Sequence, residues 1–226
     1  MTDSVVKDAQ TSAPAAENFW RVYGLAFMRP ARAMERLVRS REPVRFGALG
    51  VAITGVTYSL VYFFLSQNGG RPTVFKPWLA IPAELYYRYN LLLHVPSLLL
   101  AWVAATGFTQ LAARALGGKG TFETTLGALG LGIGVASWGT GLHDLFTTCL
   151  GYLRLLDQRA YEDAMSTPGT GAHRLIWALM LLYLSALLWL FTRGVGVAHG
   201  LRVGSALACG ALGFIVYQSI FALFNR

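Results

Sequence analysis

Residues 116–126, with the sequence LGGKGTFETTL, form a short polar segment between two long apolar runs. The run before it, residues 91–113, contains no Lys, Arg, Asp or Glu, and the run after it, residues 125–150, contains only Asp144, which follows His143. Each run is longer than the roughly 20 apolar residues that a helix needs to cross a bilayer. The segment therefore predicts a tight turn between two transmembrane helices at a membrane surface.

The residues of this segment are typical of a helix end followed by a helix start. Gly117 can adopt the left-handed conformation that closes a helix. Thr121 can cap the next helix through its side-chain oxygen, and Glu123 would then face the positive end of the helix dipole. We therefore expect one helix to end near Gly117 and the next to begin near Thr121.

The turn and an earlier stretch of the chain together resemble a known family. The turn residues are Gly117, Gly118, Lys119, Gly120, Thr121 and Phe122, and the earlier stretch is residues 27–37, FMRPARAMERL. On these motifs the chain resembles the bacterial branch of the Yip (Ypt-interacting protein) domain family, from about residue 19 onward. The resemblance implies a cytoplasmic N-terminal segment with an aromatic-Arg-Pro pattern, followed by five membrane spans with this turn between the second and the third.

One departure limits what the resemblance implies. The family pattern has a proline in the third span, and that stretch of this chain contains instead the glycines Gly130, Gly132, Gly134, Gly139 and Gly141. No role tied to that proline is carried over to this chain. Eukaryotic members of the family are associated with Rab-type GTPases and vesicle traffic, but a resemblance to the bacterial branch does not imply those partners.

The composition excludes an ordinary soluble domain. Of the 226 residues, 54% are hydrophobic and only 13% are charged, and the mean hydropathy is +0.47. These values predict an all-α polytopic membrane protein. The net charge of +8 is spread between the apolar runs rather than gathered on one compact basic surface, so we expect anionic lipids and no nucleic acid as partners.

The hydropathy pattern predicts a short tail, an amphipathic segment and a membrane domain. The tail, residues 1–16, is rich in Ser, Thr, Ala and Asp and is expected to be disordered. Residues 17–45 form the amphipathic segment, and residues 46–226 form the membrane domain. The five predicted transmembrane helices cover residues 46–66, 91–113, 125–150, 175–192 and 203–224.

The amphipathic segment combines aromatic residues at helical spacing with several arginines. We expect two short helices in the cytoplasmic headgroup region, because such a mixture of rings and arginines suits a membrane interface. The alternative is a surface helix packed on the bundle. The residues predicted to bind the membrane surface or a protein partner are Trp20, Arg21, Phe27, Arg29, Arg32, Arg36 and Arg39.

The distribution of Lys and Arg predicts the orientation of the chain. If the N-terminus is cytoplasmic, 12 of the 19 basic residues lie on the cytoplasmic side and seven lie on the other side. Cytoplasmic loops carry the excess of Lys and Arg in membrane proteins. We therefore expect a multi-pass protein with a cytoplasmic N-terminus and an extracytoplasmic C-terminus, in the bacterial cytoplasmic membrane by resemblance.

A second candidate site is polar and lies at the expected extracytoplasmic ends of the spans. Its predicted members are Glu84, Arg88, His94, His143 and Asp144. A carboxylate next to an imidazole can hold a proton, a cation or a lipid amine, and ionisable groups at membrane depth need a partner or water. The alternative is a structural ion pair between Asp144 and either Arg88 or Arg154.

The sequence predicts neither an enzyme nor a metal or cofactor site. Gly117–Thr121 lacks the Lys-Ser/Thr order and the first glycine of a phosphate-binding loop, and no Gly-x-Ser-x-Gly or His-Glu-x-x-His motif is present. Cys149 and Cys209 stand alone and are expected to be packing residues. We expect an integral membrane interaction or membrane-organising protein that binds the bilayer and either a protein partner or a second copy of itself. The alternative is a small ion, proton or lipid transporter or channel.

Overall fold

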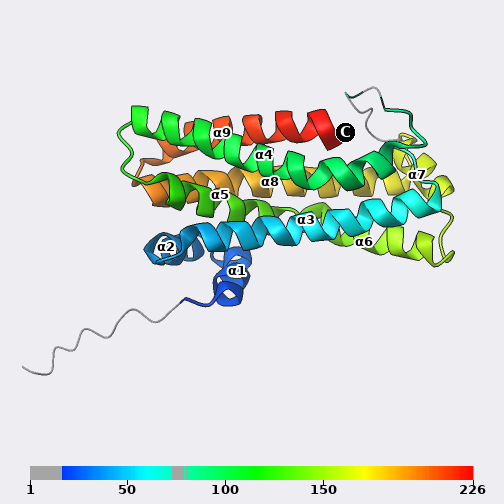
Figure 1. The fold of residues 1–226 in the computed structure, drawn as a ribbon, viewed down its shortest axis with the longest axis horizontal. Helices are drawn as coiled ribbons and strands as arrows, with labels where there is room; N and C mark the ends of the chain where they lie inside the picture. The colour runs from blue at the N-terminus through cyan, green and yellow to red at the C-terminus, as the bar shows by residue number, and fades with distance from the viewer. Residues whose placement is uncertain (1–16, 73–78, 80, 226) are drawn as a thin grey trace, which may run out of the picture.

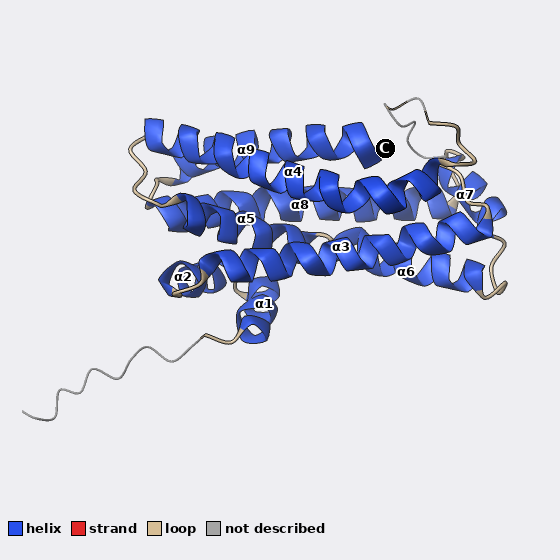
Figure 2. Cartoon of the chain, viewed as in Figure 1, coloured by secondary structure: helices blue, strands red, loops and turns tan. Residues whose placement is uncertain are grey.

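The computed structural model describes residues 17–72, 79 and 81–225, so the predicted tail, residues 1–16, lies outside the described residues. Within these residues the chain forms helices and no strand (Figure 2). The helices are α1 (Phe19–Met28), α2 (Pro30–Arg39), α3 (Pro43–Asn68), α4 (Tyr86–Ala115), α5 (Phe122–Ala136), α6 (Trp138–Tyr152), α7 (Gln158–Ser166), α8 (Gly171–His199) and α9 (Val203–Asn225). The predicted all-α fold of a polytopic membrane protein is confirmed.

The long helices run up and down beside one another to form a bundle (Figure 1). Four of them, α3, α4, α8 and α9, are long and apolar enough to cross a membrane singly. The pair α5 and α6 passes the same test only when taken together, and its axis bends by 44° at the break. A bend of this size does not reverse the direction of the chain, and α6 continues toward the end of the bundle that α5 approaches (Figure 1).

The two ends of the bundle differ in what they contain. Helix α2 lies at one end with the α4–α5 turn and the α8–α9 turn, and we call this the α2 end (Figure 1). Helix α1 lies against the side of the bundle, between α2 and the kink. Helix α7 lies at the opposite end, which we call the α7 end. This arrangement gives five crossings when the bent pair counts as one.

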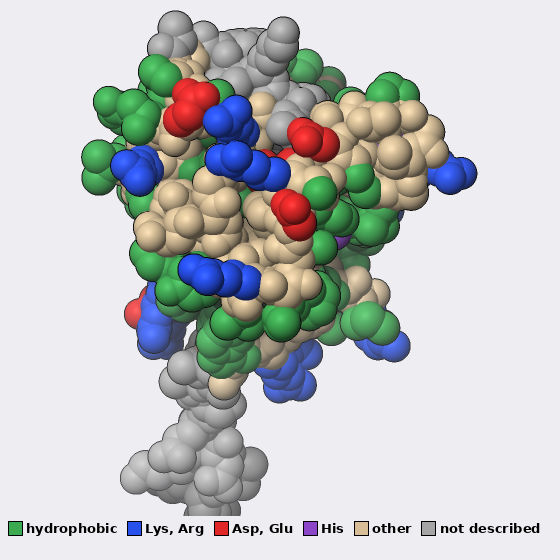
Figure 3. All heavy atoms as spheres, turned by 90° about the vertical axis from the view of Figure 1, so that its right-hand side faces the viewer, with side chains coloured by type: hydrophobic (Ala, Val, Ile, Leu, Met, Phe, Trp, Pro, Cys, Tyr) green, Lys and Arg blue, Asp and Glu red, His purple; other side chains and the backbone are tan. Residues whose placement is uncertain are grey.

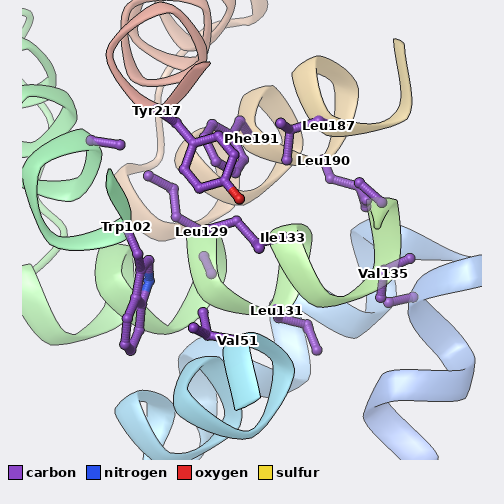
Figure 4. Close-up of a cluster of buried hydrophobic side chains, with 14 of the residues drawn as sticks. Val51, Trp102, Leu129, Leu131, Ile133, Val135, Leu187, Leu190, Phe191 and Tyr217 are labelled. Atoms are coloured by element: carbon purple, nitrogen blue, oxygen red, sulfur yellow. The ribbon is translucent and has the colours of Figure 1, made fainter. Parts of the chain in front are cut away.

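Helix α5 is the centre of the bundle because nearly all of its residues after the first turn are buried. Leu129, Leu131 and Ile133 project to different sides and meet Val51 of α3 and Phe191 of α8 among their neighbours (Figure 4). Apolarity on every side is shared by core helices and lipid-facing spans. The glycines and alanines of α5 let the neighbouring helices approach it closely, and this places α5 at the core.

Helices α3 and α5 touch backbone to backbone through glycines. A Cβ atom added to Gly130 would lie 2.6 Å from the carbonyl oxygen of Gly47, and one added to Gly134 would lie 2.6 Å from the Cα of Gly50. Such contacts hold helices together in lipid, where burial of apolar surface gives little drive for association. Gly130 and Gly134 therefore allow α3 and α5 to approach closely.

The third predicted span, residues 125–150, is interrupted at Ser137. The Ser137 hydroxyl donates to the carbonyl oxygen of Gly134 at 3.0 Å, and the Tyr23 hydroxyl of α1 donates to the same oxygen at 2.7 Å. The Tyr23 oxygen also accepts a hydrogen bond from Trp138 Nε1 at 2.7 Å. Kinks arise at Gly and Ser residues where side chains enter the helical hydrogen-bond ladder, so the bend is fixed by α1 as well as by the local sequence.

Apolar side chains are exposed along the length of the bundle. Val56, Leu92, Leu111, Leu181 and Ile215 are all more than half exposed. A soluble monomer rarely exposes so much apolar surface, whereas lipid tails cover it without cost. The flanks of the bundle therefore fit a bilayer.

Several helices extend beyond their predicted limits. Helix α8 continues from the predicted limit of residue 192 to His199, so Arg193 and His199, which were expected in a loop, are helical. Helix α7 lies in a stretch expected to be a loop, and Asp157 caps it by accepting a hydrogen bond from the backbone of Ala160 at 3.1 Å. His199 can continue the helix because it hydrogen-bonds to the α4–α5 turn and to Thr125, whereas Arg193 is exposed.

Candidate functional site

The N-terminal helices α1 and α2 pack on the bundle with one face. Val22 and Ala26 of α1 and Met34 and Leu37 of α2 are buried in the main core. Helix α1 packs on α5, and α2 packs on α5 and α8. This is the packed arrangement that the sequence left open as an alternative, and it leaves the opposite face of each helix outside the bundle.

The outer face of this helix pair carries the residues predicted to bind a membrane surface or partner. Trp20 is 68% exposed and Met28 is 82% exposed. The exposed members of the predicted set are Trp20, Arg21, Phe27, Arg29, Arg32 and Arg39. Arg36 is partly buried and lies 3.7 Å from a carboxylate oxygen of Glu17. The helix pair therefore presents rings and guanidinium groups on one surface.

The turn that resembles the family motif is bound to the end of α8. Gly117 has a φ of +84°, and the backbone N–H of Gly118 donates to the carbonyl oxygen of Ala113 at 2.8 Å, so α4 closes as predicted. The backbone N–H of Lys119 donates to the carbonyl oxygen of His199 at 3.1 Å. The side chains of Lys119 and Phe122 stay exposed. The backbone of the turn therefore has a structural role, while the lysine remains free to face lipid headgroups or a partner.

A ring of four hydrogen bonds joins this turn to three helices. The N–H of Gly120 donates to His199 Nδ1 at 3.2 Å, which places the imidazole proton on Nε2, 2.8 Å from Thr125 Oγ1. The Thr125 hydroxyl then donates to Gln110 Oε1 at 2.7 Å, and Gln110 Nε2 donates to the carbonyl oxygen of Gly120 at 3.0 Å. Every polar group of the ring has a partner only when His199 is neutral.

The glycines of the turn allow this approach. A Cβ atom on Gly118 would lie 2.8 Å from His199 Nδ1, and one on Gly120 would lie 2.5 Å from the carbonyl oxygen of Ala198. The sequence predicted the turn but not its partner, because nothing local distinguishes His199 from a loop histidine.

The second candidate site is a cavity of about 180 Å³ at the α7 end. We call it the α7 cavity. Its polar and aromatic walls include Tyr58, Tyr62, Tyr87, Ser137, Thr140, His143, Asp144, Gln158, Glu162, Tyr183 and Tyr217. Acidic and basic side chains stand near one another on the surface of this end (Figure 3). The cavity extends inward to the kink, where Thr54 Oγ1 and Ser137 Oγ are 3.0 Å apart.

His143 and Asp144, which the sequence singled out, both line the α7 cavity. His143 Nδ1 lies 2.9 Å from Asp144 Oδ1, and His143 Nε2 lies 2.8 Å from the Tyr161 hydroxyl. Asp144 thus meets its neighbouring imidazole rather than Arg88 or Arg154, both of which are exposed. The pair is held at the cavity wall by α7.

The other predicted members of the polar site lie elsewhere. His94 is fully buried, with its ring centroid 5.1 Å from that of Tyr62 and 5.8 Å from that of Tyr58, so it lies behind the tyrosines of the cavity wall. Glu84 is exposed and lies 3.6 Å from Arg71. Arg88 is exposed as well, so the structure brings together only part of the predicted cluster.

Two residues of α7 complete the cavity and were not predicted. Glu162 is 3% exposed and accepts hydrogen bonds from the backbone N–H of Arg71 at 2.9 Å and from Gln158 Nε2 at 3.1 Å. Burial raises the pKa of the Glu162 carboxyl above its usual value. The four-residue spacing of Gln158 and Glu162 behind the capping residue Asp157 is the signal that could have indicated a helix here.

Comparisons of the chain with family models, with curated proteins and with solved structures find no match. Among the described residues, no three His, Cys, Asp or Glu side chains come close enough together to hold a metal ion. The candidate functional features are therefore the surface of α1 and α2 and the α7 cavity.

Proposed function

We propose that this chain is a non-enzymatic integral membrane protein of the Yip-like type, which organises a membrane surface or binds a partner there through α1 and α2. The observation that carries the proposal is the folding of these two helices onto the bundle with their apolar faces buried and their arginines and rings exposed. A helix pair fixed in this way presents a preformed surface.

The chemistry of this surface favours anionic lipid. Arginine and aromatic side chains suit the headgroup region because the rings are amphipathic and guanidinium binds phosphate in two-pronged geometry. Arg29, Arg32 and Arg39 are exposed on or just before α2, and Lys119 is exposed on the adjacent turn. Under the positive-inside rule this end faces the cytoplasm, which puts the N-terminus inside. The resemblance to the bacterial branch of the Yip family favours a bacterial cytoplasmic membrane.

The proposal is tested by lipid selectivity in vesicles. The full chain, with both cysteines replaced by serine, is labelled at Gly24→Cys, an exposed position where a Cβ meets nothing within 4 Å. Energy transfer is measured to acceptor-labelled phosphatidylglycerol or phosphatidylcholine. We expect higher transfer to the anionic lipid, and we expect the substitutions Arg32→Glu, Arg36→Glu and Arg39→Glu together to abolish that preference.

The matched control reverses three exposed arginines at the α7 end. Arg88→Glu, Arg154→Glu and Arg174→Glu change the net charge by the same amount and should leave the preference unchanged. Equal transfer to both lipids in the parent protein, or an unchanged preference after the reversal on α2, would refute the proposal.

A second candidate function is the transport of an ion, a proton or a lipid, and the α7 cavity favours it. The cavity carries polar groups from Glu162 on α7 to Ser137 at the kink. Beyond the kink, α3 and α5 touch at Gly50 and Gly134, so a transport cycle would have to separate these helices. Flux in reconstituted vesicles that disappears in Asp144→Asn and persists in Glu84→Gln would support transport, and absence of flux would contradict it.

A further inference from the structure

The α7 cavity has a size, a pattern of hydrogen-bonding groups and a wall chemistry that together define a ligand class. Its volume of about 180 Å³ is similar to that of a cavity that holds a molecule of benzene size, so it suits a group of about six heavy atoms. A whole lipid or a nucleotide does not fit, whereas a small molecule or a lipid headgroup does.

Three donors in the cavity wall are already used. The Thr148 hydroxyl donates to the backbone oxygen of Asp144 at 2.6 Å, and the Thr147 hydroxyl donates to the backbone oxygen of His143 at 2.9 Å. The amide nitrogen of Gln158 donates to Glu162. A ligand that accepted hydrogen bonds from these groups would have to break the bonds that they already make.

Two carboxylates stand in the cavity wall, those of Asp144 and Glu162. The side chain of Asp144 is 26% exposed. Carboxylates form strong, charge-assisted hydrogen bonds with N–H donors that carry a positive charge. The wall therefore suits a cationic ligand with several N–H donors.

The apolar part of the wall agrees with this chemistry. Tyr62 and Tyr87 are stacked with their ring centroids 5.9 Å apart, and Tyr58, Tyr183 and Tyr217 line the same space. Aromatic faces attract cations, most strongly where water is excluded. The one guanidinium that lines the cavity belongs, within the described residues, to Arg71, which pairs with Glu84.

From these observations we infer that the α7 cavity binds a small primary ammonium group, either as a free amine or as the headgroup of an aminophospholipid. The ammonium donates to the carboxylates of Asp144 and Glu162, and the tyrosines surround its carbon atoms. The inference deepens the second candidate function, but binding at equilibrium involves no flux, so a failure to bind and a failure to transport are separate results.

The test measures binding to the full chain in nanodiscs of phosphatidylcholine, which has no primary amine. Ethanolamine is titrated by calorimetry, and tetramethylammonium serves as a cation of similar size without N–H donors. We expect saturable ethanolamine binding at least tenfold tighter than tetramethylammonium binding. Asp144→Asn and Glu162→Gln should each weaken ethanolamine binding at least tenfold, while the exposed Glu84→Gln should bind normally.

A second arm distinguishes the two sources of the ammonium group. Native mass spectrometry of protein in mixed lipid would show retained phosphatidylethanolamine, lost in Asp144→Asn, if the headgroup is the ligand. Retention without binding of free ethanolamine supports the lipid source, and binding of free ethanolamine without retention supports the free amine. The inference is overturned if the protein neither binds free ethanolamine nor retains phosphatidylethanolamine. It is also overturned if Asp144→Asn and Glu162→Gln keep the parent's size-exclusion profile and bind ethanolamine as tightly as the parent does.

Discussion

His199 shows how much one side chain can organise in this fold. It is 2% exposed, and its two ring nitrogens join the turn at Gly120 to Thr125 at the start of α5. The sequence gives no sign of this role, because the partners are more than 70 residues away along the chain. By contrast, the glycines and the capping threonine of the turn could be predicted, because their requirements are local.

Replacing His199 with alanine should destabilise the bundle by about 1–3 kcal/mol, because the N–H of Gly120 is then buried without an acceptor. Chemical unfolding in detergent, followed by circular dichroism, measures the change. Lys119→Ala is the control, since only the backbone of Lys119 contacts His199 and its side chain is exposed. Equal stabilities of the two variants would contradict the role of His199.

Glu162 predicts a pH dependence of stability. Desolvation raises the pKa of its carboxyl in the folded state, so the folded protein binds this proton more tightly than the unfolded chain does. The protonated Glu162 carboxyl therefore contributes its full stabilisation at pH values below the pKa of the unfolded chain. This stabilisation is lost as the pH rises through the raised pKa of the folded protein. Two charged side chains act on this carboxyl: Arg159 lowers its pKa and Asp163 raises it. The hydrogen bond from the backbone N–H of Arg71 also lowers the pKa. Tyr87 of α4 is a titratable group that interacts electrostatically with Glu162.

The measurement is the unfolding midpoint of the apo protein between pH 4 and pH 8, in parent and Glu162→Gln proteins. The parent should lose stability relative to the variant as the pH rises. The neutral amide keeps an acceptor oxygen for the N–H of Arg71, so the variant should fold. Parallel curves for the two proteins would show that Glu162 does not titrate in this way.

Among the contacts between helices, the close contact of α3 and α5 should be the most sensitive to mutation. Gly130→Ala places a methyl group against the backbone of Gly47 and should destabilise the protein by about 1–3 kcal/mol. Gly107→Ala in α4 is the matched control, because a Cβ there meets nothing within 4 Å and alanine is the better helix former by about 1 kcal/mol. Thermal unfolding in detergent should rank Gly107→Ala at or above the parent and Gly130→Ala below it.

The elements themselves divide into those that hydropathy could predict and those that it could not. Four of the predicted spans fall within long apolar helices, and the third covers the bent pair α5 and α6. Hydropathy could predict them because length and apolarity are properties of the sequence alone. The kink at Ser137 needed the Tyr23 hydroxyl of another helix, and α7 is too short and too polar for a hydropathy signal. Tertiary contacts determine the kink and α7, so neither feature could be predicted from hydropathy.

At the scale of the whole molecule, the two ends of the bundle carry different chemistry. The α2 end presents arginines and rings on a packed helix pair, and the α7 end encloses a cavity walled by tyrosines and carboxylates. From the sequence one could predict the basic and aromatic residues of the N-terminal surface and two residues of the cavity wall, His143 and Asp144. It could not predict Gln158 and Glu162, because they stand on a helix expected to be a loop.

Five passages through the membrane require that α5 and α6 together make one crossing. Lys119 precedes α5 and Ser166 ends α7 beyond α6, and both are exposed. Single cysteines at Lys119→Cys and Ser166→Cys, in a chain with Cys149 and Cys209 replaced by serine, can be labelled in intact cells with a membrane-impermeant maleimide. We expect labelling of the cysteine at position 166 and protection of the one at 119 until the membrane is permeabilised. Equal accessibility of the two positions from one side would contradict a single crossing by α5 and α6.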